Sequence, residues 1–389
     1  MARTKLPKGG LAALQELCRH GELTRRELQG LLEVSGPTIT RVVSHLDELG
    51  LISAAVIGEG SLGRPAAAIS LNPQGLGVIA VSLNSTGTTM VLASIGGTPI
   101  KDVTVDVSAD VEYETAVERL SEAARGLFSS ARTTFRAIAG IGISFGGAAS
   151  FDEGRLTTPS GFPTWHGRAL AADVRERTGL PTFIDNQPVG HIRAMRWYND
   201  QEMDNRYLCF ADWGIAGCSS TGDPRRDRGV STGGFGHMGG RLIGERPCWC
   251  GLYDCLNTRA SLRGLHSWAV RDGLVPEDLP MSEIVGALEA DSRGREALEN
   301  AARELVFAGI DACRVLGIQG YILAGSLFDS SEVARSTAAQ FLEDNKRLVA
   351  GSFLPPNLAQ RGAMLSAIAI AADGMALEGR IETMPAHTD

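Results

Sequence analysis

The chain has 389 residues, of which 43 % are hydrophobic, and a formal net charge of −8. It is too long for one ordinary domain, so two or three domains with cores of their own are expected. The sequence has no run of about 18 apolar residues and no charged-then-apolar leader, which argues against a membrane span or a secretory signal and favours a cytoplasmic protein.

The acidic charge is unevenly distributed. Residues 1–75 contain eight Lys or Arg against seven Asp or Glu, a balance of +1 that leaves −9 for the rest of the chain. Contacts with phosphate need local rather than global positive charge. A near-neutral head on an acidic body is therefore compatible with DNA binding through the head alone.

The first predicted elements form a helix-turn-helix. Thr24 and Glu27 make a capping-box pattern, in which each side chain satisfies a backbone N–H at the start of a helix. Residues 33–36 interrupt this helix, and Pro37 opens a second helix, where its missing N–H has no cost. The apolar residues of the second helix follow the spacing of one buried face: Ile39, Val42, Val43, Leu46 and Leu49. A preceding helix that would complete a three-helix core is predicted from three leucines: Leu11, Leu14 and Leu17.

The opposite face of the second helix is polar. It carries short hydrogen-bonding side chains and one guanidinium, the groups that can reach base edges and phosphates from the major groove. We predict that this face and its N-terminal flank contact DNA through five residues: Ser35, Thr38, Thr40, Arg41 and Ser44. The alternative is a helical module of the same fold that binds protein.

A wing is predicted after the second helix. Two β-prone stretches, residues 51–57 and 66–71, flank a glycine-rich segment. Such a hairpin is typical of a wing that rests on phosphate or in the minor groove. Its tip carries Arg64, the sixth predicted DNA-contacting residue, and the head is predicted to span residues 1–74.

From residue 75 onward, strand-like and helical patterns alternate. The strand-like runs are residues 78–83, 138–143, 182–184, 207–211 and 321–323. The helical patterns are residues 113–134, 170–178, 282–316 in pieces, and 331–348. This alternation predicts an α/β architecture with helices covering mixed sheets, and the polar residues after Leu377 predict a frayed tail.

Three of the seven cysteines crowd together at Cys248, Cys250 and Cys255. In a cytosolic chain such a cluster indicates metal binding rather than a disulfide framework. With the preceding Gly236-His237-Met238, the segment is close to the GHM…CxCGxxGC pattern of the ROK family, which comprises repressors, open reading frames and kinases.

The resemblance to the ROK family covers residues 10–373, the winged head included. It implies a two-lobed, actin-like (ribonuclease H-like) ATPase fold for residues 75–389. The small lobe would span residues 75–190 with a C-terminal helix added, and the large lobe, with the cysteines, residues 191–370.

The resemblance also makes His237 the fourth metal ligand. One imidazole and three thiolates form a closed tetrahedral set, the coordination of structural zinc, so we expect one zinc at His237, Cys248, Cys250 and Cys255. Asp254 replaces the family's second glycine without removing a ligand. The alternative is a set of free core cysteines.

Two loops that hold phosphate in the family's kinases are altered. In place of D-x-G-G-T the chain has Ser82-Leu83-Asn84-Ser85-Thr86, which lacks the acidic residue and both glycines. In place of G-T-G it has Asp212-Trp213-Gly214, which puts a negative charge where a triphosphate would lie. We therefore expect no ATP binding.

The catalytic base of the family's kinases is the Asp of an E-N-D-A segment. The matching residues here are Asp185-Asn186-Gln187-Pro188, so Gln187 stands at the base position. A carboxamide is not basic near neutral pH, and general-base assistance worth about 10²–10⁴-fold is lost. Asp185 matches the Glu two residues before the base and is not expected to replace it.

The sugar contacts of the family fall on Asn186, Gly234, His237 and Asn257, and Gly146 and Gly147 lie in the sugar-side loop. Two of the four contacts are retained, Asn257 is a softer replacement and Gly234 is a loss; Gly161 also replaces an Asn. We take as candidate ligand residues Gly147, Asp185, Asn186, His237 and Asn257. Because the lost carboxylates removed charge-assisted hydrogen bonds, two interpretations stay open: weak sugar binding and a relic cleft without a ligand.

Together these features predict a DNA-binding transcriptional regulator of repressor type, with a sugar or sugar derivative as effector and with kinase activity lost. The alternative is an ATP-dependent sugar kinase with an accessory DNA-binding head, and a protein-binding scaffold is a third interpretation. Helix-turn-helix proteins usually bind inverted repeats in double-stranded DNA as dimers, so a homodimer or a dimer of dimers is expected.

Overall fold

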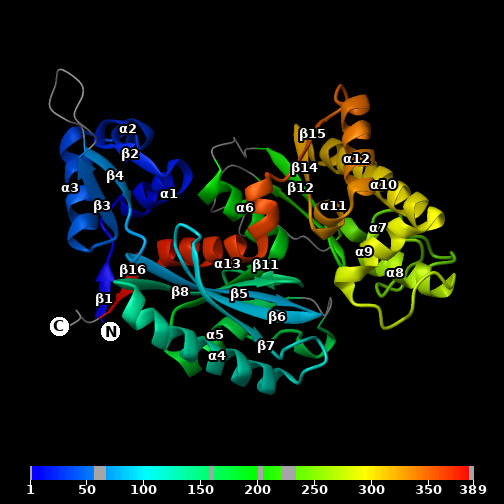
Figure 1. Cartoon of the computed structure of the whole chain (residues 1–389), viewed down its shortest axis with the longest axis horizontal. Helices are drawn as coiled ribbons and strands as arrows, with labels where there is room; N and C mark the ends of the chain where they lie inside the picture. The colour runs from blue at the N-terminus through cyan, green and yellow to red at the C-terminus, as the bar shows by residue number, and fades with distance from the viewer. Residues whose placement is uncertain (1, 57–66, 158–161, 200–204, 221–233, 385–389) are drawn as a thin grey trace. The chain divides into compact units, whose positions relative to one another are not determined.

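The computed structural model describes residues 2–56, 67–157, 162–199, 205–220 and 234–384. The chain divides into two compact units (Figure 1). The first unit comprises Met1–Gln201 and Gly362–Asp389, and the second comprises Glu202–Arg361. Among the described residues, no helix combines the length and the apolar character that a membrane crossing requires.

A small α/β head begins the first unit. Its elements are α1 (Gly10–His20), β2 (Glu22–Thr24), α2 (Arg25–Leu31), α3 (Gly36–Glu48), β3 (Ile52–Val56) and β4 (Ala67–Leu71). The three predicted helices are confirmed, and six of the eight predicted core residues are buried: Leu14, Leu17, Ile39, Val42, Val43 and Leu46. The other two, Leu11 and Leu49, are only half-buried. Strands β3 and β4 pair antiparallel as the predicted wing hairpin, and β2 adds a third strand on β4. The tip of the wing lies outside the described residues.

Local sequence signals set the helix boundaries of the head. The Thr24 hydroxyl accepts a hydrogen bond from the Glu27 N–H at 3.2 Å, and the Glu27 carboxylate accepts one from the Thr24 N–H at 2.7 Å. The predicted capping box at the start of α2 is therefore confirmed. Pro37 lies in the first turn of α3, as expected from its missing donor.

The remainder of the first unit is a seven-stranded sheet between helices. Its strands are β1 (Ala2–Lys5), β5 (Leu76–Asn84), β6 (Gly87–Ser94), β7 (Pro99–Val105), β8 (Ala137–Phe145), β11 (Thr182–Asn186) and β16 (Arg380–Thr383). The order is β1-β16-β8-β5-β6-β7, with β11 also parallel to β8. Two short strands, β9 (Ala149–Ser150) and β10 (Arg155–Leu156), and the 3₁₀ turn η1 (Pro163–Trp165) follow β8.

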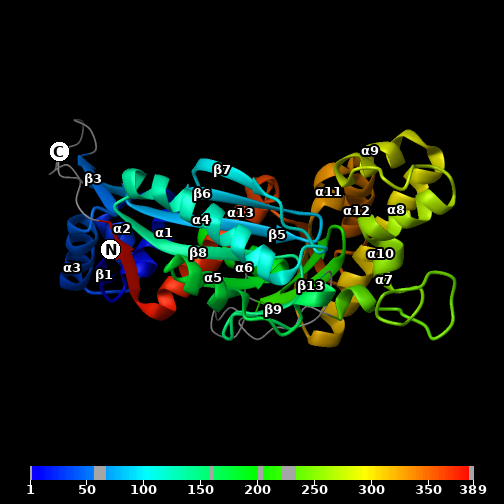
Figure 2. The ribbon, with the colours of Figure 1, turned by 90° about the horizontal axis from the view of Figure 1, so that it is seen from below.

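Helices cover both faces of this sheet. Helices α4 (Tyr113–Thr134) and α5 (Leu170–Thr178) lie on one face, and α13 (Pro356–Glu378) lies on the other (Figures 1 and 2). Gly142 of β8 permits the close approach of α13, because a Cβ there would lie 1.9 Å from the Ala367 carbonyl oxygen. Helix α6 (Gln187–Tyr198) follows β11 directly and packs on α13, where Gly190 meets Ser366.

The sequence interpretation was wrong about the tail and missed several elements. The residues after Leu377 do not fray at once: they finish α13 and form β16, whose Ile381 is buried and which pairs with both β1 and β8. Strand β1 and helix α6 were not predicted from the sequence.

The second unit contains a four-stranded sheet in the order β13-β12-β14-β15. Its strands are β12 (Arg206–Ala211), β13 (Ile215–Ser220), β14 (Gly320–Ala324) and β15 (Ala350–Phe353). Its helices are η3 (Phe235–His237), α7 (Leu256–Ala260), α8 (Leu262–Arg271), α9 (Met281–Ala290), α10 (Ser292–Leu316), α11 (Ser326–Ser330) and α12 (Glu332–Asn345). Asp291 starts α10 by accepting hydrogen bonds from the N–H groups of Arg293 and Gly294, which explains why residues 282–316 form two helices.

Candidate DNA-contacting face, metal site and ligand residues

Helix α3 presents the predicted polar face to solvent. Ser35, Thr40, Arg41 and Ser44 are exposed, and Thr38 is half-buried. The Ser35 and Thr38 hydroxyls lie 2.8 Å apart at the start of the helix. Within the described part of the chain Arg41 has no ion pair, so its guanidinium is available to a phosphate or a base edge. The sixth predicted residue, Arg64, lies outside the described residues.

The head is held against the sheet of its own unit by helix α1. The carbonyl oxygen of Arg196, in the last turn of α6, accepts hydrogen bonds from Gln15 at 3.1 Å and from Arg19. The Cys18 thiol and the Tyr198 hydroxyl both point to the Ile95 carbonyl oxygen, at 3.7 and 2.8 Å. These contacts fix α1 between the end of β6 and the end of α6.

The four predicted metal ligands lie together in the second unit. Their ligand atoms all lie within 4.8 Å of one another, so the group could hold a metal ion. The Cys248 sulfur lies 3.4 Å from Nδ1 of His237, and the sulfurs of Cys250 and Cys255 lie 3.6 Å apart. Burial raises the pKa of Cys255 to about 12, so a nearby cation is what would keep this thiol ionised. One imidazole and three sulfurs fit a tetrahedral zinc ion.

A tight hairpin brings the three cysteines to His237. Arg241 and Tyr253 exchange two backbone hydrogen bonds of 2.8 Å, and the Cys248 N–H donates to the Leu252 carbonyl at 2.8 Å. Asp254, which replaces the family's glycine, has a positive φ of 53°. Its carboxylate accepts the N–H groups of Glu245 and Arg246 at 3.3 and 3.2 Å, which closes the hairpin just before Cys255.

Three predicted ligand residues belong to the first unit. Gly147 follows the end of β8, and its neighbour Gly146 packs so closely that a Cβ there would lie 2.6 Å from the Asn84 side-chain oxygen. Asn186 ends β11 and caps α6, because its side-chain oxygen accepts the Val189 N–H at 3.1 Å. Gln187, which stands at the base position of the family's kinases, follows Asn186 and is the first residue of α6.

Asp185 is buried in an ion-pair network rather than directed to an open cleft. Arg193 donates to its carboxylate from Nε and Nη2, at 3.2 and 2.8 Å, and also pairs with Asp373. Trp197 donates to the second oxygen of Asp373 at 2.9 Å. Burial raises the pKa of Asp185 to about 6, and Arg193 opposes that rise. These contacts give the Asp185 carboxylate a structural role. Its assignment as a ligand residue remains a prediction, and the contacts with Arg193 argue against it.

The other two candidate ligand residues belong to the second unit. His237 also belongs to the metal cluster, and burial lowers its pKa. The buried Asn257 uses its side-chain oxygen to accept the Ile215 N–H at 2.7 Å, which ties α7 to the start of β13. Gly234 is exposed at the start of η3, and Gly161 lies outside the described residues.

The loop that replaces the family's second phosphate loop is closed by its own side chains. The Asp212 carboxylate accepts the Trp213 N–H at 2.9 Å and a hydrogen bond from Ser326 of α11. Burial raises the pKa of Asp212, and a second carboxyl group, that of Asp329, lies close enough for the two to repel each other. An anionic phosphate would meet two acidic groups at this loop.

Comparisons with known proteins agree with this architecture. The model of the ROK family matches residues 86–374. A curated relative, the "putative xylose repressor" of Caldicellulosiruptor sp. (strain Rt8B.4), is 24% identical over 340 residues, which are 86% of this chain and 84% of the relative.

Two solved structures illustrate the fold. A ROK family transcriptional regulator, described as a homolog of the E. coli MLC protein, superposes with a TM-score of 0.70 at 20% identity, over 96% of this chain and 98% of that one. A ROK family glucokinase from Streptomyces griseus, solved with glucose and AMPPNP, gives a TM-score of 0.57 at 18% identity, over 76% of this chain and 98% of the kinase. The regulator therefore matches the head as well as the body, whereas the kinase leaves about a quarter of this chain uncovered.

Proposed function

This chain belongs to the ROK family, and from that premise we propose that it is a sugar-responsive transcriptional repressor that binds double-stranded DNA through its winged head. The observation that carries the proposal is the exposed polar face of α3, with Arg41 at its centre, which has no ion pair among the residues that the structure describes. The same helix buries its apolar face in the head, so the polar side chains are free to enter a major groove. The repressor-named relative, which spans nearly the whole chain, supports this assignment.

Kinase activity is not part of the proposal. Gln187 offers no base for the attacking hydroxyl, and the Asp212 loop would repel a triphosphate. In a working kinase with an accessory head, other residues would have to supply the catalytic base and the phosphate-binding loop. Asp185 is a poor substitute for the base, because its carboxylate is already bound by Arg193.

We further propose that the metal is one structural zinc ion per chain. His237, Cys248, Cys250 and Cys255 would hold it, and the closed set of four leaves no position for a reactive water. The ion would fix the hairpin between η3 and α7.

An effector sugar at Asn186 would act on the helix that also holds the head. Asn186 caps the first turn of α6, and Arg196 in its last turn accepts hydrogen bonds from Gln15 and Arg19 of α1. A helix of 12 residues spans about 18 Å, so a shift of its first turn reaches α1 without a flexible link. The operator is proposed to be an inverted repeat read by a homodimer or a dimer of dimers in the cytoplasm.

The proposal is tested by selecting genomic fragments that the purified chain retards in a gel, and then titrating the shift with sugars. Arg41→Ala should weaken specific binding by roughly 1–3 kcal/mol if its guanidinium contacts a guanine edge. The control is Arg132→Ala, which removes an exposed arginine from α4 of the body and should bind like the parent. If Arg41→Ala and the parent melt alike and bind the selected fragment equally, the head is not the DNA reader.

A further inference from the structure

Helix α10 of the second unit exposes a large aromatic side chain near its middle. Phe307 is 48 % exposed, although the helix buries its other face in the core of the unit. The Phe307 ring meets the half-buried ring of Phe341 on α12 edge-on, with the two centroids 5.9 Å apart. Helices α10 and α12 lie side by side (Figure 1). The two rings therefore form an apolar patch on the outer surface of this helix pair.

Two opposite charges flank Phe307 at equal distances along α10. Arg303 lies four residues before it and Asp311 four residues after it, and residues spaced by four form one ridge on a helix surface. Asp311 is exposed and has no ion pair among the residues that the structure describes. Arg303 lies over the Phe341 ring, 5.5 Å from its centroid, and pairs with Glu299 of its own helix at 2.9 Å. An exposed pair of this kind contributes little, so Arg303 is free to pair elsewhere.

The ridge of Arg303, Phe307 and Asp311 is complementary to its own reverse. If a second α10 packs across a two-fold axis at Phe307, the two helices run in opposite directions, and each Arg303 faces the partner's Asp311. Ridges of residues four apart interlock in the commonest class of helix contacts, at a crossing angle of about −50°. Seven residues from Phe307, Asn300 would face the partner's Arg314, so no like charges meet along the ridge.

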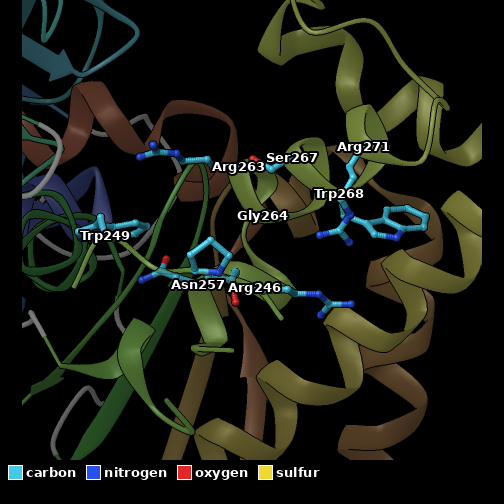
Figure 3. Close-up of a pocket in the computed structure, with 10 residues that line it drawn as sticks. Arg246, Trp249, Asn257, Arg263, Gly264, Ser267, Trp268 and Arg271 are labelled. Carbon is cyan, nitrogen blue, oxygen red and sulfur yellow. The ribbon is translucent and has the colours of Figure 1, made fainter. Parts of the chain in front are cut away.

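The other exposed apolar group of the second unit is unsuited to such self-contact. It lies on the metal hairpin and comprises Leu242, Ile243 and Trp249. The hairpin borders a cavity of about 300 Å³ whose charged lining residues are all arginines: Arg246, Arg263 and Arg271. Figure 3 shows the guanidinium group of Arg263 directed toward Trp249 and that of Arg246 directed away from it, so positive charge faces both sides. Two copies that met there would bring like charges together, which opposes association.

We propose that α10 forms the contact of a two-fold homodimer, with the Phe307 rings at the centre and an Arg303–Asp311 ion pair on each side. A two-fold contact uses each favourable pair twice, and aromatic residues and arginine are enriched in protein interfaces. The proposal rests on the homodimer of the proposed function and names the surface that forms it. All residues of the ridge belong to the second unit, so the contact can be measured apart from DNA binding.

The test is sedimentation equilibrium of the full-length chain over a wide range of concentration, in which the parent should associate to a dimer. Asp311→Arg should raise the dissociation constant of the dimer at least about tenfold, because each new guanidinium would face the partner's Arg303. Adding Arg303→Asp to Asp311→Arg reverses both charges and should restore association, a recovery that a merely local role of these residues would not produce.

The control is Glu122→Arg, which makes the same reversal of charge at an exposed position of α4 in the first unit. It should associate like the parent. Phe307→Ser removes the central rings and provides a second variant of the ridge if Asp311→Arg alters the melting curve.

Three results would overturn the proposal: the parent sediments as a monomer, Asp311→Arg and Phe307→Ser both associate like the parent, or the double variant dissociates as readily as Asp311→Arg alone. A gel shift on the same preparations separates this proposal from the repressor assignment. A parent that associates through α10 but retards no genomic fragment would reject only the repressor.

Discussion

Asp254 shows how a residue can depart from a family pattern and still keep the local structure. Its backbone has φ of 53°, in the left-handed region that glycine enters most easily and that Asp and Asn enter more readily than other residues. Its carboxylate then accepts two backbone N–H groups, from Glu245 and Arg246, which a glycine cannot do. Compared with glycine, Asp254 adopts this backbone conformation less easily, but it adds two hydrogen bonds to the metal hairpin.

The metal cluster makes a prediction about a single sulfur. Cys250 is the exposed member of the cluster, so Cys250→Ser removes a ligand with little loss of packing. We expect zinc content to fall well below one ion per chain, and the melting temperature of the second unit to fall by about 2–4 °C for each kcal/mol lost.

Metal analysis and calorimetry on the purified variant measure both effects. Cys18→Ser is the matched control, because Cys18 lies outside the cluster and a serine hydroxyl can also donate to the Ile95 carbonyl. Unchanged zinc content and melting in Cys250→Ser would show that the four residues do not form a metal site.

For individual residues, the sequence predicted the cluster whose members are close together in the chain. It missed the cluster whose members are far apart in the chain. The cysteines fall within one hairpin, so their spacing alone indicated a metal site, with His237 added by the family resemblance. The Asp185 network was not predictable in this way. Its third member, Asp373, lies on a helix 180 residues beyond Arg193, and no local pattern connects them.

Among the elements, the helices of the head were predictable because their signals are local. The capping box, Pro37 and the apolar period of α3 each occupy fewer than 15 residues. Helix α6 carries no such signal: nearly all of its residues are buried, including Arg193 and His191, so its sequence has no polar face to set a period. Helix α13 lacks an amphipathic period for the same reason, since all residues from Ala367 to Ala372 are completely buried.

The capping box at the start of α2 gives a prediction at the level of elements. Thr24→Ala removes the hydroxyl that accepts the Glu27 N–H, and should destabilise α2 by about 1 kcal/mol. Amide hydrogen exchange across α2 measures the loss. Thr40→Ala, on the exposed face of α3, should leave exchange in α2 unchanged. Equal exchange in both variants would contradict a stabilising role for the cap.

The same cap should respond to pH. The Thr24 N–H and hydroxyl lower the pKa of Glu27, so the carboxylate form stabilises the folded helix. A lowered folded pKa means that this stabilisation is present at neutral pH and is lost as the pH falls through that pKa. In Thr24→Ala the exchange rates of α2 should depend less on acid pH than in the parent.

For the molecule as a whole, the head is attached to the sheet of the first unit at two points in the chain. After β4 the chain runs directly into β5, and before α1 it forms β1, which pairs with β16 over four residues. Arg3 and Glu382 add an ion pair of 2.9 Å across this pairing. The head is thus anchored on both sides, a feature that the alternating pattern of the body did not predict.

Removing β1 tests the importance of the second anchor. Deletion of residues 2–5 leaves β16 paired with β8, so the sheet should survive, with a melting temperature about 2–4 °C lower for each kcal/mol lost. We expect faster amide exchange in α1, whose N-terminal flank is freed. Exchange in β5 and β8 serves as the internal control, and an α1 that exchanges as in the parent would show that the β4 connection suffices.

The pairing of β1 with β16 also has a consequence for how the chain is made. The partners Arg3 and Glu382 are 379 residues apart, so β1 leaves the ribosome long before the strand that it pairs with. Domains fold as they emerge, and contacts between distant residues form late. The three helices of the head can thus form early, while its second attachment must wait until β16, Arg380–Thr383, has been synthesised. A ribosome that stalls within α13 would release a head that is folded but held at one side only.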